Sequence, residues 1–72
     1  MNIVVWSKDD CQWCDQAKNL LQQRGIEYTE RKLGYGWTKE QLLESIPGAR
    51  TLPQITIDGV NIGGFKELKE RI

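Results

Sequence analysis

The chain has 72 residues, which is enough for one small domain but not for a second hydrophobic core, so a single domain over residues 1–72 is predicted. Apolar residues make up 39% of the sequence, and ten Lys and Arg residues balance ten Asp and Glu residues, which excludes the composition of disordered chains. A net charge of zero without a basic run also argues against nucleic acid as a partner, because phosphate binding depends on clustered cations.

The first half of the chain predicts a strand, a helix and a second strand. Ile3–Trp6 is short, β-branched and aromatic without polar alternation, which suits a strand buried on both faces. Apolar residues at helical spacing predict a helix from the neighbourhood of Cys14 to Arg24, followed by a helix-ending Gly25. Ile26–Glu30 alternates apolar and polar residues, as an edge strand does. This unit implies two parallel strands joined by a right-handed crossover.

The second half begins with another predicted helix. Thr38 and Gln41 carry the signature of a capping box, so a helix should begin there and end at Pro47-Gly48. The expected buried stripe of this helix consists of Leu42, Leu43 and Ile46.

A hairpin and a last helix complete the predicted fold. Asp58-Gly59 lies between two β-branched runs and supplies the positive φ angles of a type I′ turn. Gly63-Gly64 then leads into a helix with Phe65, Leu68 and Ile72 on one face. The predicted class is α/β with the order β-α-β-α-β-β-α, a four-stranded mixed sheet with helices on both faces.

Two cysteines, Cys11 and Cys14, carry the reactive chemistry of the sequence. The chain has no histidine, which removes the commonest general base and metal ligand. A disulfide between residues three apart closes too short a loop to stabilise a fold much, so the C-x-x-C pair indicates redox chemistry. The alternatives are half of a zinc site, although the sequence has no third Cys and no His to complete it, and two inert buried residues.

The expected position of this pair, where a strand gives way to a helix, predicts a different role for each sulfur. Unpaired N–H groups at a helix N-terminus favour a thiolate and lower the pKa of an exposed cysteine, so Cys11 is the predicted nucleophile. Cys14 lies one turn further into the helix and is predicted to be more buried. It would resolve a mixed disulfide by attacking Cys11.

The sequence resembles the glutaredoxin family, which has the thioredoxin fold, over essentially its whole length. Three segments carry the resemblance: Ser7–Cys14 with the cysteine pair, Thr51–Ile55 before the hairpin, and Ile62–Phe65 after it. The resemblance implies a three-layer thioredoxin-like fold and a dithiol oxidoreductase that uses glutathione as reductant, without a tightly bound cofactor or metal. It also implies a cis peptide bond before Pro53, next to the reactive sulfurs.

The resemblance further implies where glutathione binds. Leu52 would offer its backbone N–H and C=O to the cysteine of glutathione, as in strand addition, and Lys8 would pair with a glutathione carboxylate. The glycine pair and the following helix N-terminus would hold the γ-glutamyl carboxylate, because glycine allows close backbone approach. The implied glutathione-binding residues are Lys8, Trp13, Thr51, Leu52, Pro53, Gly63, Gly64, Phe65 and Lys66.

The sequence departs from the commonest family pattern near both ends of this site. Gln12 and Trp13 stand between the cysteines where Pro and Tyr are commonest. Lys66 stands where many relatives carry an acidic or hydroxyl residue that receives the γ-glutamyl amino group, a role for which Glu67 is the available substitute. Lys66 would instead attract the γ-glutamyl carboxylate.

Charged and aromatic residues near the cysteines lead to two more expectations. Like charges oppose thiol ionisation, so Cys11 is predicted to be less acidic than is usual in the family because of three aspartates: Asp9, Asp10 and Asp15. Tyr35 and Trp37 are flanked by glycines and are expected to pack over the sheet, with exposure for a protein partner as the alternative.

The function predicted from these residues is that of a dithiol glutaredoxin. Cys11 would attack a protein disulfide or a glutathionylated protein, and Cys14 or glutathione would resolve the intermediate. The first alternative is a glutaredoxin-like thioredoxin that a thioredoxin reductase reduces and that donates electrons to ribonucleotide reductase. Two others are an iron–sulfur cluster carrier, in which Cys11 and glutathione ligate iron, and a non-catalytic interaction domain.

Without a signal sequence or an apolar run of ~20 residues, we expect a cytoplasmic monomer without membrane contact.

Overall fold

The computed structural model describes all 72 residues and contains four strands and three helices. In chain order these elements are β1 (Ile3–Ser7), α1 (Gln12–Gln23), β2 (Thr29–Lys32), α2 (Lys39–Ser45), β3 (Gln54–Ile57), β4 (Val60–Gly63) and α3 (Phe65–Arg71). The strands form one mixed sheet in the order β2-β1-β3-β4, with β1 and β2 parallel and the other pairs antiparallel. The predicted class and element order are therefore confirmed.

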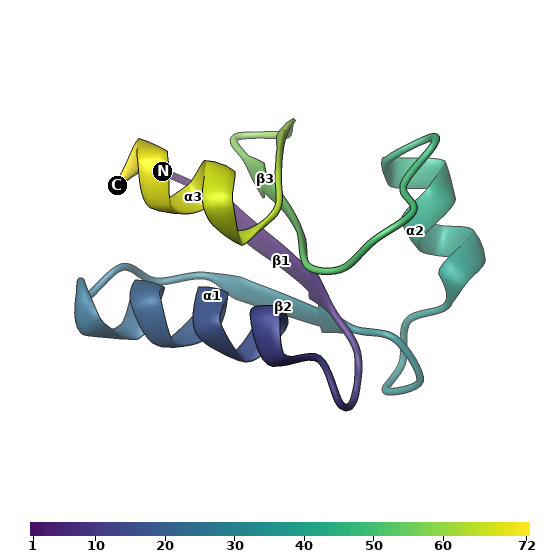
Figure 1. Cartoon of the computed structure of the whole chain (residues 1–72). Helices are drawn as coiled ribbons and strands as arrows, with labels where there is room; N and C mark the ends of the chain where they lie inside the picture. The colour runs from purple at the N-terminus through teal and green to yellow at the C-terminus, as the bar shows by residue number, and fades with distance from the viewer.

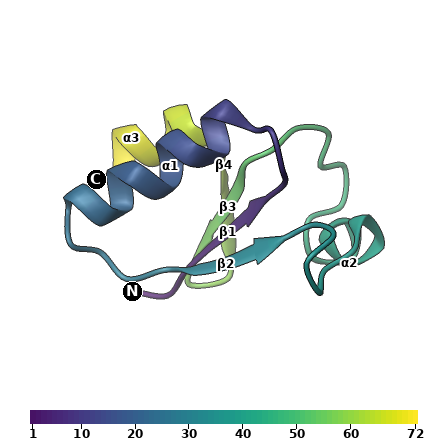
Figure 2. The same ribbon diagram turned by 90° about the horizontal axis from the view of Figure 1, so that it is seen from below.

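Helices cover both faces of the sheet. Figures 1 and 2 show α1 and α3 side by side on one face and α2 on the opposite side. Because alternate residues of a strand point to opposite faces, β1 contributes to the core on both of them. Its residues Ile3 and Val5 belong to the larger core cluster, under α1 and α3, and Val4 and Trp6 belong to a smaller cluster under α2. The predicted burial of this strand on both faces is confirmed.

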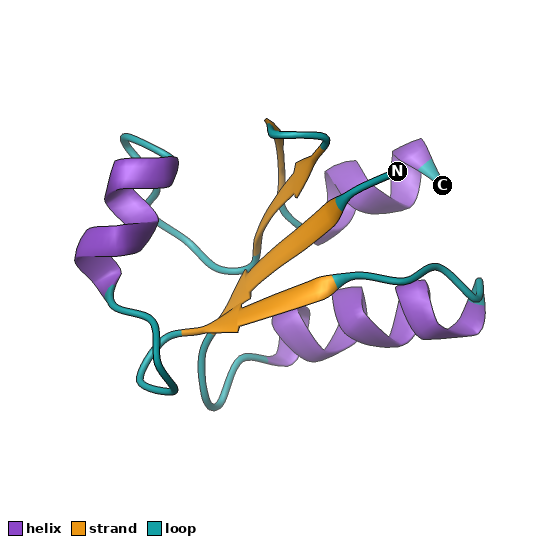
Figure 3. Cartoon of the chain, turned by 180° about the vertical axis from the view of Figure 1, so that it is seen from behind, coloured by secondary structure: helices purple, strands orange, loops and turns teal.

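The α2 helix lies near the carboxyl end of β1, as Figure 3 shows. Leu42 and the C-cap residue Ile46, whose N–H donates to the carbonyl of Leu42, both pack in the smaller core cluster. The prediction that Leu43 belongs to this buried stripe is wrong, because its side chain is 37% exposed. The reason is that this seven-residue helix touches the sheet with one narrow face, and adjacent residues point about 100° apart around a helix.

The edge strand β2 is confirmed, but it begins three residues later than predicted, at Thr29, which pairs with Val4. The end of the preceding helix accounts for this difference. Gly25 adopts a φ of 65°, and the N–H of Ile26 donates to the carbonyl of Leu21, which keeps this part of the chain at the helix end. Ile26 and Tyr28 still pack against the larger core cluster. Their alternating pattern therefore reflects burial of the segment that precedes β2, before its pairing with β1 begins at Thr29.

Three local signals in the sequence are confirmed by the backbone. Thr38 and Gln41 form a reciprocal capping box at the start of α2. Asp58 and Gly59 both have positive φ angles, 51° and 83°, between the paired strands β3 and β4. Phe65 and Ile72 pack around the buried Leu68 in the larger core cluster. No helix combines the length and apolar composition that crossing a membrane requires.

A charged network ties α1 to β2 and to the carboxyl end of β1. Glu30 on β2 accepts hydrogen bonds from the Oγ atom of the buried Ser7, at 2.5 Å, and from the Nζ atom of Lys18, at 2.9 Å. Burial by itself would raise the pKa of Glu30, but the hydrogen bonds from Ser7 and Lys18 outweigh it and hold this pKa below its ordinary value. The network therefore favours the folded state only while Glu30 is ionised.

We expect acid to weaken the fold through Glu30. Because its pKa is lower in the folded state, the contribution of Glu30 is complete above its ordinary pKa of 4.5 and is lost as the pH falls toward the folded pKa. A Glu30→Gln variant should lose about 1 kcal/mol of unfolding free energy at pH 7. Below pH 4.5, its unfolding free energy should fall less steeply with pH than that of the parent. Urea unfolding between pH 7 and pH ~3 measures both effects.

The matched control is Glu27→Gln, which alters an exposed glutamate on the segment before β2. It should leave both the stability and its pH dependence close to those of the parent. If the unfolding free energies of Glu30→Gln and the parent protein changed with pH in the same way, the role assigned to this network would be contradicted.

Candidate active site

The two cysteines lie where the chain turns from β1 into α1. Cys11 is the N-cap of α1, and its Sγ atom accepts a hydrogen bond from the N–H of Cys14 at 3.2 Å. The sulfurs form a disulfide, and the Cα atoms are 5.2 Å apart. Cys11 keeps 8% of its surface exposed while Cys14 is completely buried, which confirms the expected difference in burial. After reduction, the same helix N–H would favour a thiolate at Cys11.

A loop segment before β3 lies against the outer sulfur. The peptide bond between Leu52 and Pro53 is cis, as expected. The carbonyl oxygen of Leu52 lies 3.6 Å from the Sγ atom of Cys11, although 41 positions separate the two residues. The N–H of Leu52 donates no hydrogen bond within the chain. A peptide lying beside Cys11 would therefore find both a free donor and an acceptor on Leu52.

A groove of about 310 Å³ opens beside this segment. One wall is the ring of Trp13, which is 56% exposed and stacks on the ring of Phe65 with the centroids 5.7 Å apart. Seven of the nine residues predicted to bind glutathione line this groove, together with Glu67: Trp13, Thr51, Leu52, Pro53, Gly64, Phe65 and Lys66.

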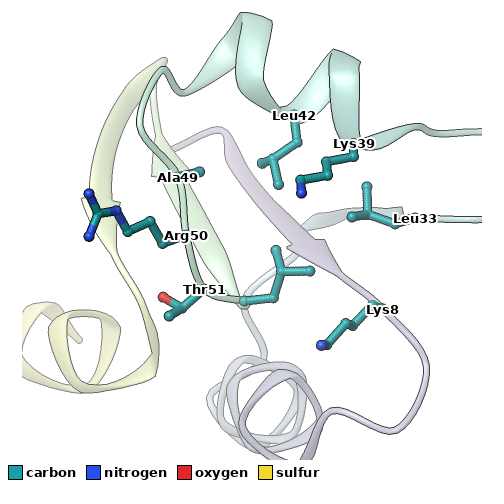
Figure 4. Close-up of a pocket in the computed structure, with 8 residues that line it drawn as sticks. Lys8, Leu33, Lys39, Leu42, Ala49, Arg50 and Thr51 are labelled. Carbon is teal, nitrogen blue, oxygen red and sulfur yellow. The ribbon is translucent and has the colours of Figure 1, made fainter.

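The other two predicted residues lie elsewhere. Lys8 lines a neighbouring pocket of about 450 Å³ that shares Thr51 and Leu52 with the groove (Figure 4). Gly63 does not line either space. It has a φ of 111°, and a Cβ atom built on it would lie 2.7 Å from the carboxylate of Glu67, so its lack of a side chain makes room for that carboxylate. The structure thus gives Gly63 a steric role in shaping the helix start.

Glu67 also lines the groove, although the sequence names it only as the substitute for the acidic residue that many relatives carry at the position of Lys66. Its Oε1 atom accepts a hydrogen bond from the N–H of Gly64 at 2.8 Å, in the position of a capping-box acid. The signal for this contact was present in the sequence, because Gly64 and Glu67 have the same spacing as the capping pair of α2. A glycine N-cap has no side chain to complete the usual capping signature, which made the pair hard to recognise.

Two of the three aspartates near the sulfurs have charged partners. Asp9 accepts a hydrogen bond from the hydroxyl of Tyr35 at 2.8 Å and pairs with Lys32 at 3.0 Å, and these contacts hold its pKa below the ordinary value. Asp15 lies 3.6 Å from Lys18. These lysines offset part of the negative charge expected around Cys11, so the repulsion of its thiolate is smaller than the sequence alone suggests.

The two aromatic residues after β2 have different environments. Trp37 packs edge-on against Trp6, with the ring centroids 5.3 Å apart, so the packing expected of it is confirmed. The same expectation is wrong for Tyr35, which is 61% exposed, because its ring turns outward to bring the hydroxyl to Asp9. This contact links the loop after β2 to the loop that carries Lys8.

Comparisons with known proteins agree with this geometry. The glutaredoxin family model matches residues 3–62. Glutaredoxin 3 of Escherichia coli K12 is 33% identical over 67 residues, which cover 93% of this chain and 81% of that protein. The crystal structure of a buckwheat glutaredoxin–glutathione complex is 33% identical and superimposes with a TM-score of 0.80, covering 96% of this chain and 66% of that one.

A third comparison concerns the fold alone. NrdH-redoxin from Escherichia coli, described as a glutaredoxin-like protein with a thioredoxin-like activity profile, has a TM-score of 0.77 at 20% identity, covering 97% of this chain and 93% of that one.

The fold and the cysteine pair define a thiol–disulfide oxidoreductase with a thioredoxin-like fold. Within that class, the family match and the identity to glutaredoxin 3 show that the chain belongs to the glutaredoxin family.

The contact between Tyr35 and Asp9 leads to a prediction for the active-site loop. In a Tyr35→Phe variant, Asp9 should titrate closer to its ordinary pKa, because the hydrogen bond is the largest cause of the lowered value. An NMR titration of the Asp9 carboxyl carbon measures this change. Tyr28→Phe, which alters a tyrosine bonded to Gln22 instead, is the control and should leave Asp9 unchanged. An identical Asp9 titration in Tyr35→Phe and the parent would contradict the contact.

Proposed function

We propose that the protein is a glutathione-dependent dithiol oxidoreductase that reduces protein disulfides and glutathionylated proteins. The observation that carries this proposal is the free peptide group of Leu52 beside the sulfur of Cys11. Glutathione is a tripeptide whose central residue is a cysteine. When its sulfur lies at Cys11, its own backbone is within reach of the Leu52 N–H and C=O, which supports pairing in the manner of a short strand.

The charges around this segment support the same ligand. Glutathione carries a carboxylate at each end. Lys8 and Lys66 line the two spaces that flank Leu52, and neither lysine forms an ion pair within the chain. Each carboxylate would therefore find an unpaired cation. The buckwheat glutaredoxin that forms a complex with glutathione is also a structural neighbour, which supports this assignment.

The γ-glutamyl end would bind at the start of α3. Glu67 already accepts the Gly64 N–H, so a ligand carboxylate at this point would compete with it for that donor. The ammonium group of the γ-glutamyl residue would instead pair with Glu67, while its carboxylate turns toward Lys66. This arrangement fits the departure at Lys66, because the acidic partner of the ammonium group has moved by one position.

The reaction consists of two thiol–disulfide exchanges. In the reduced protein, the Cys11 thiolate attacks one sulfur of the substrate disulfide, forms a mixed disulfide and releases the other sulfur as a thiolate. The Cys14 thiolate then attacks the Cys11 sulfur, which forms the disulfide seen in the structure and releases the second substrate thiolate. Two electrons pass to the substrate, whose thiolates take up two protons. Two glutathione molecules restore the dithiol and become glutathione disulfide.

The reductant is the first point to test. Purified oxidised protein should be reduced rapidly by glutathione with glutathione reductase and NADPH, and slowly by thioredoxin reductase with NADPH, with thiols counted over time. A Lys8→Gln variant should require roughly threefold more glutathione for half-maximal rate, whereas Lys69→Gln, at an exposed site on α3, should not. Reduction by thioredoxin reductase alone would contradict the proposal and favour the glutaredoxin-like thioredoxin, whose electrons pass to an enzyme such as ribonucleotide reductase.

Single cysteine variants test the roles of the two sulfurs. Cys11→Ser should lose all exchange activity, because the only partly exposed sulfur is gone. Cys14→Ser should still remove glutathione from a glutathionylated peptide, with free glutathione completing the exchange, but should reduce a protein disulfide at least ~100-fold more slowly, since resolution within the molecule is lost. A Cys11→Ser variant that keeps the activity of the parent in the cell would indicate a non-catalytic interaction domain.

A further inference from the structure

The sheet face that packs against α2 is only partly covered by this helix. Figures 2 and 3 show α2 beside the carboxyl ends of β1 and β2, so no helix lies over the amino-terminal part of this face. A pocket of about 310 Å³, at the lower end of the volumes that hold small ligands, opens on it. The polar residues of its lining are Asn2, Arg31, Thr56 and Ser45, the last residue of α2. We call this space the Arg31 pocket.

The Arg31 pocket is separate from the redox site. It shares no lining residue with the groove or with the pocket that contains Lys8. Asn2 precedes β1, and Gly59 lies two residues after Ile57, the partner of Ile3, so this part of the lining belongs to the amino-terminal end of β1. The cysteines follow the opposite end of that strand. A ligand in the Arg31 pocket would therefore not take the place of a disulfide substrate.

Arg31 supplies the only charged side chain of this lining. Its Cζ atom lies 4.5 Å from the ring centroid of Trp37 and 5.2 Å from that of Trp6, so both indoles hold the guanidinium by cation–π interaction. The guanidinium nevertheless forms no ion pair and no hydrogen bond, and its Nε atom is buried without a partner. Because an unpaired buried donor is costly, a hydrogen-bond acceptor bound here would be stabilising.

The other polar side chains of the pocket are also unpaired. The hydroxyls of Ser45 and Thr56 and the side-chain amide of Asn2 form no hydrogen bond within the chain. No acidic residue lines the pocket, and Asp58 instead accepts the backbone N–H of Asn2 at 2.7 Å. The end of α2 contributes only a partial negative charge, which the full charge of Arg31 exceeds. The pocket therefore favours an anion.

We infer that the Arg31 pocket binds a phosphate group, either free or as the ester of a small molecule. A guanidinium presents pairs of N–H groups in one plane, and such a pair matches two phosphate oxygens. The two hydroxyls and the amide of the lining supply further donors for the remaining oxygens of this tetrahedral group. A carboxylate has only two oxygens, in one plane, and would use fewer of these donors.

Two-dimensional proton–nitrogen NMR of the oxidised protein tests this inference at constant ionic strength and pH ~7.5, where phosphate monoesters are mainly dianions. The probes are inorganic phosphate and glycerol phosphate, and acetate is the carboxylate control. Both phosphates should shift the Nε–H signal of Arg31 and the amide signal of Ser45, with half-saturation at roughly 1 mM. Acetate should bind at least ~10-fold more weakly. Tighter binding of glycerol phosphate would identify an ester as the ligand, and equal binding would identify free phosphate.

A charge placed in the pocket gives the matched comparison. Ser45→Glu leaves Arg31 and its two indoles in place but adds a carboxylate that competes for the guanidinium, so phosphate binding should weaken at least ~10-fold. Gln23→Glu makes the same charge change at an exposed site on α1 and should bind phosphate as the parent does. Arg31→Lys keeps the charge but loses the planar pair of donors, and should weaken binding roughly threefold or more.

The inference would be overturned by the absence of a saturable shift at the Nε–H of Arg31, or by an equal response to acetate and phosphate. Unchanged phosphate binding in Ser45→Glu would also overturn it. If Gln23→Glu weakened binding as much as Ser45→Glu, the attraction would come from the charge of the whole protein, and the pocket would not be a site. None of these outcomes depends on which reductant restores the cysteine pair.

Discussion

The placement of the Cys11 sulfur against the Leu52 carbonyl is the contact on which the rest of the site depends. It results from the antiparallel pairing of β1 and β3, in which Trp6 near the end of one strand lies opposite Gln54 at the start of the other. The loop leaving β1 and the loop entering β3 therefore meet at the same edge of the sheet. The first loop carries the N-cap of α1, and the second carries the peptide group that a substrate backbone would pair with.

In a chain this short, several residues serve both the fold and the site. The Cys11 sulfur is the proposed nucleophile and also the acceptor that caps α1. Pro53 is buried next to the groove that it lines, and Gly63 makes room for the carboxylate that caps α3. Such double use is expected of a small domain, because few residues are left over once a core has been built.

The zero net charge of the chain conceals a local imbalance. Of the aspartates beside the cysteines, Asp9 is paired with Lys32 at the end of β2, and Asp15 is paired with Lys18 one turn further along α1. The lysines at positions 8, 39 and 66 line the spaces around the Leu52 segment and have no such partner. The unpaired charge near the disulfide is thus mainly positive, which suits an anionic partner such as the glutathione proposed above.

The sequence alone determined the features that depend on neighbouring residues. These include the capping box of α2, the Asp58-Gly59 turn, the burial of β1 and the C-x-x-C pair at the start of α1. The resemblance to glutaredoxins added the cis bond at Pro53 and most residues of the groove. Tertiary structure decided the start of β2, the exposure of Leu43, the pairing of Asp9 with Lys32 and the two pockets beside the Leu52 segment. The physical reason is that caps and turns arise from contacts within a few residues, whereas register, ion pairs and pockets require distant segments to meet.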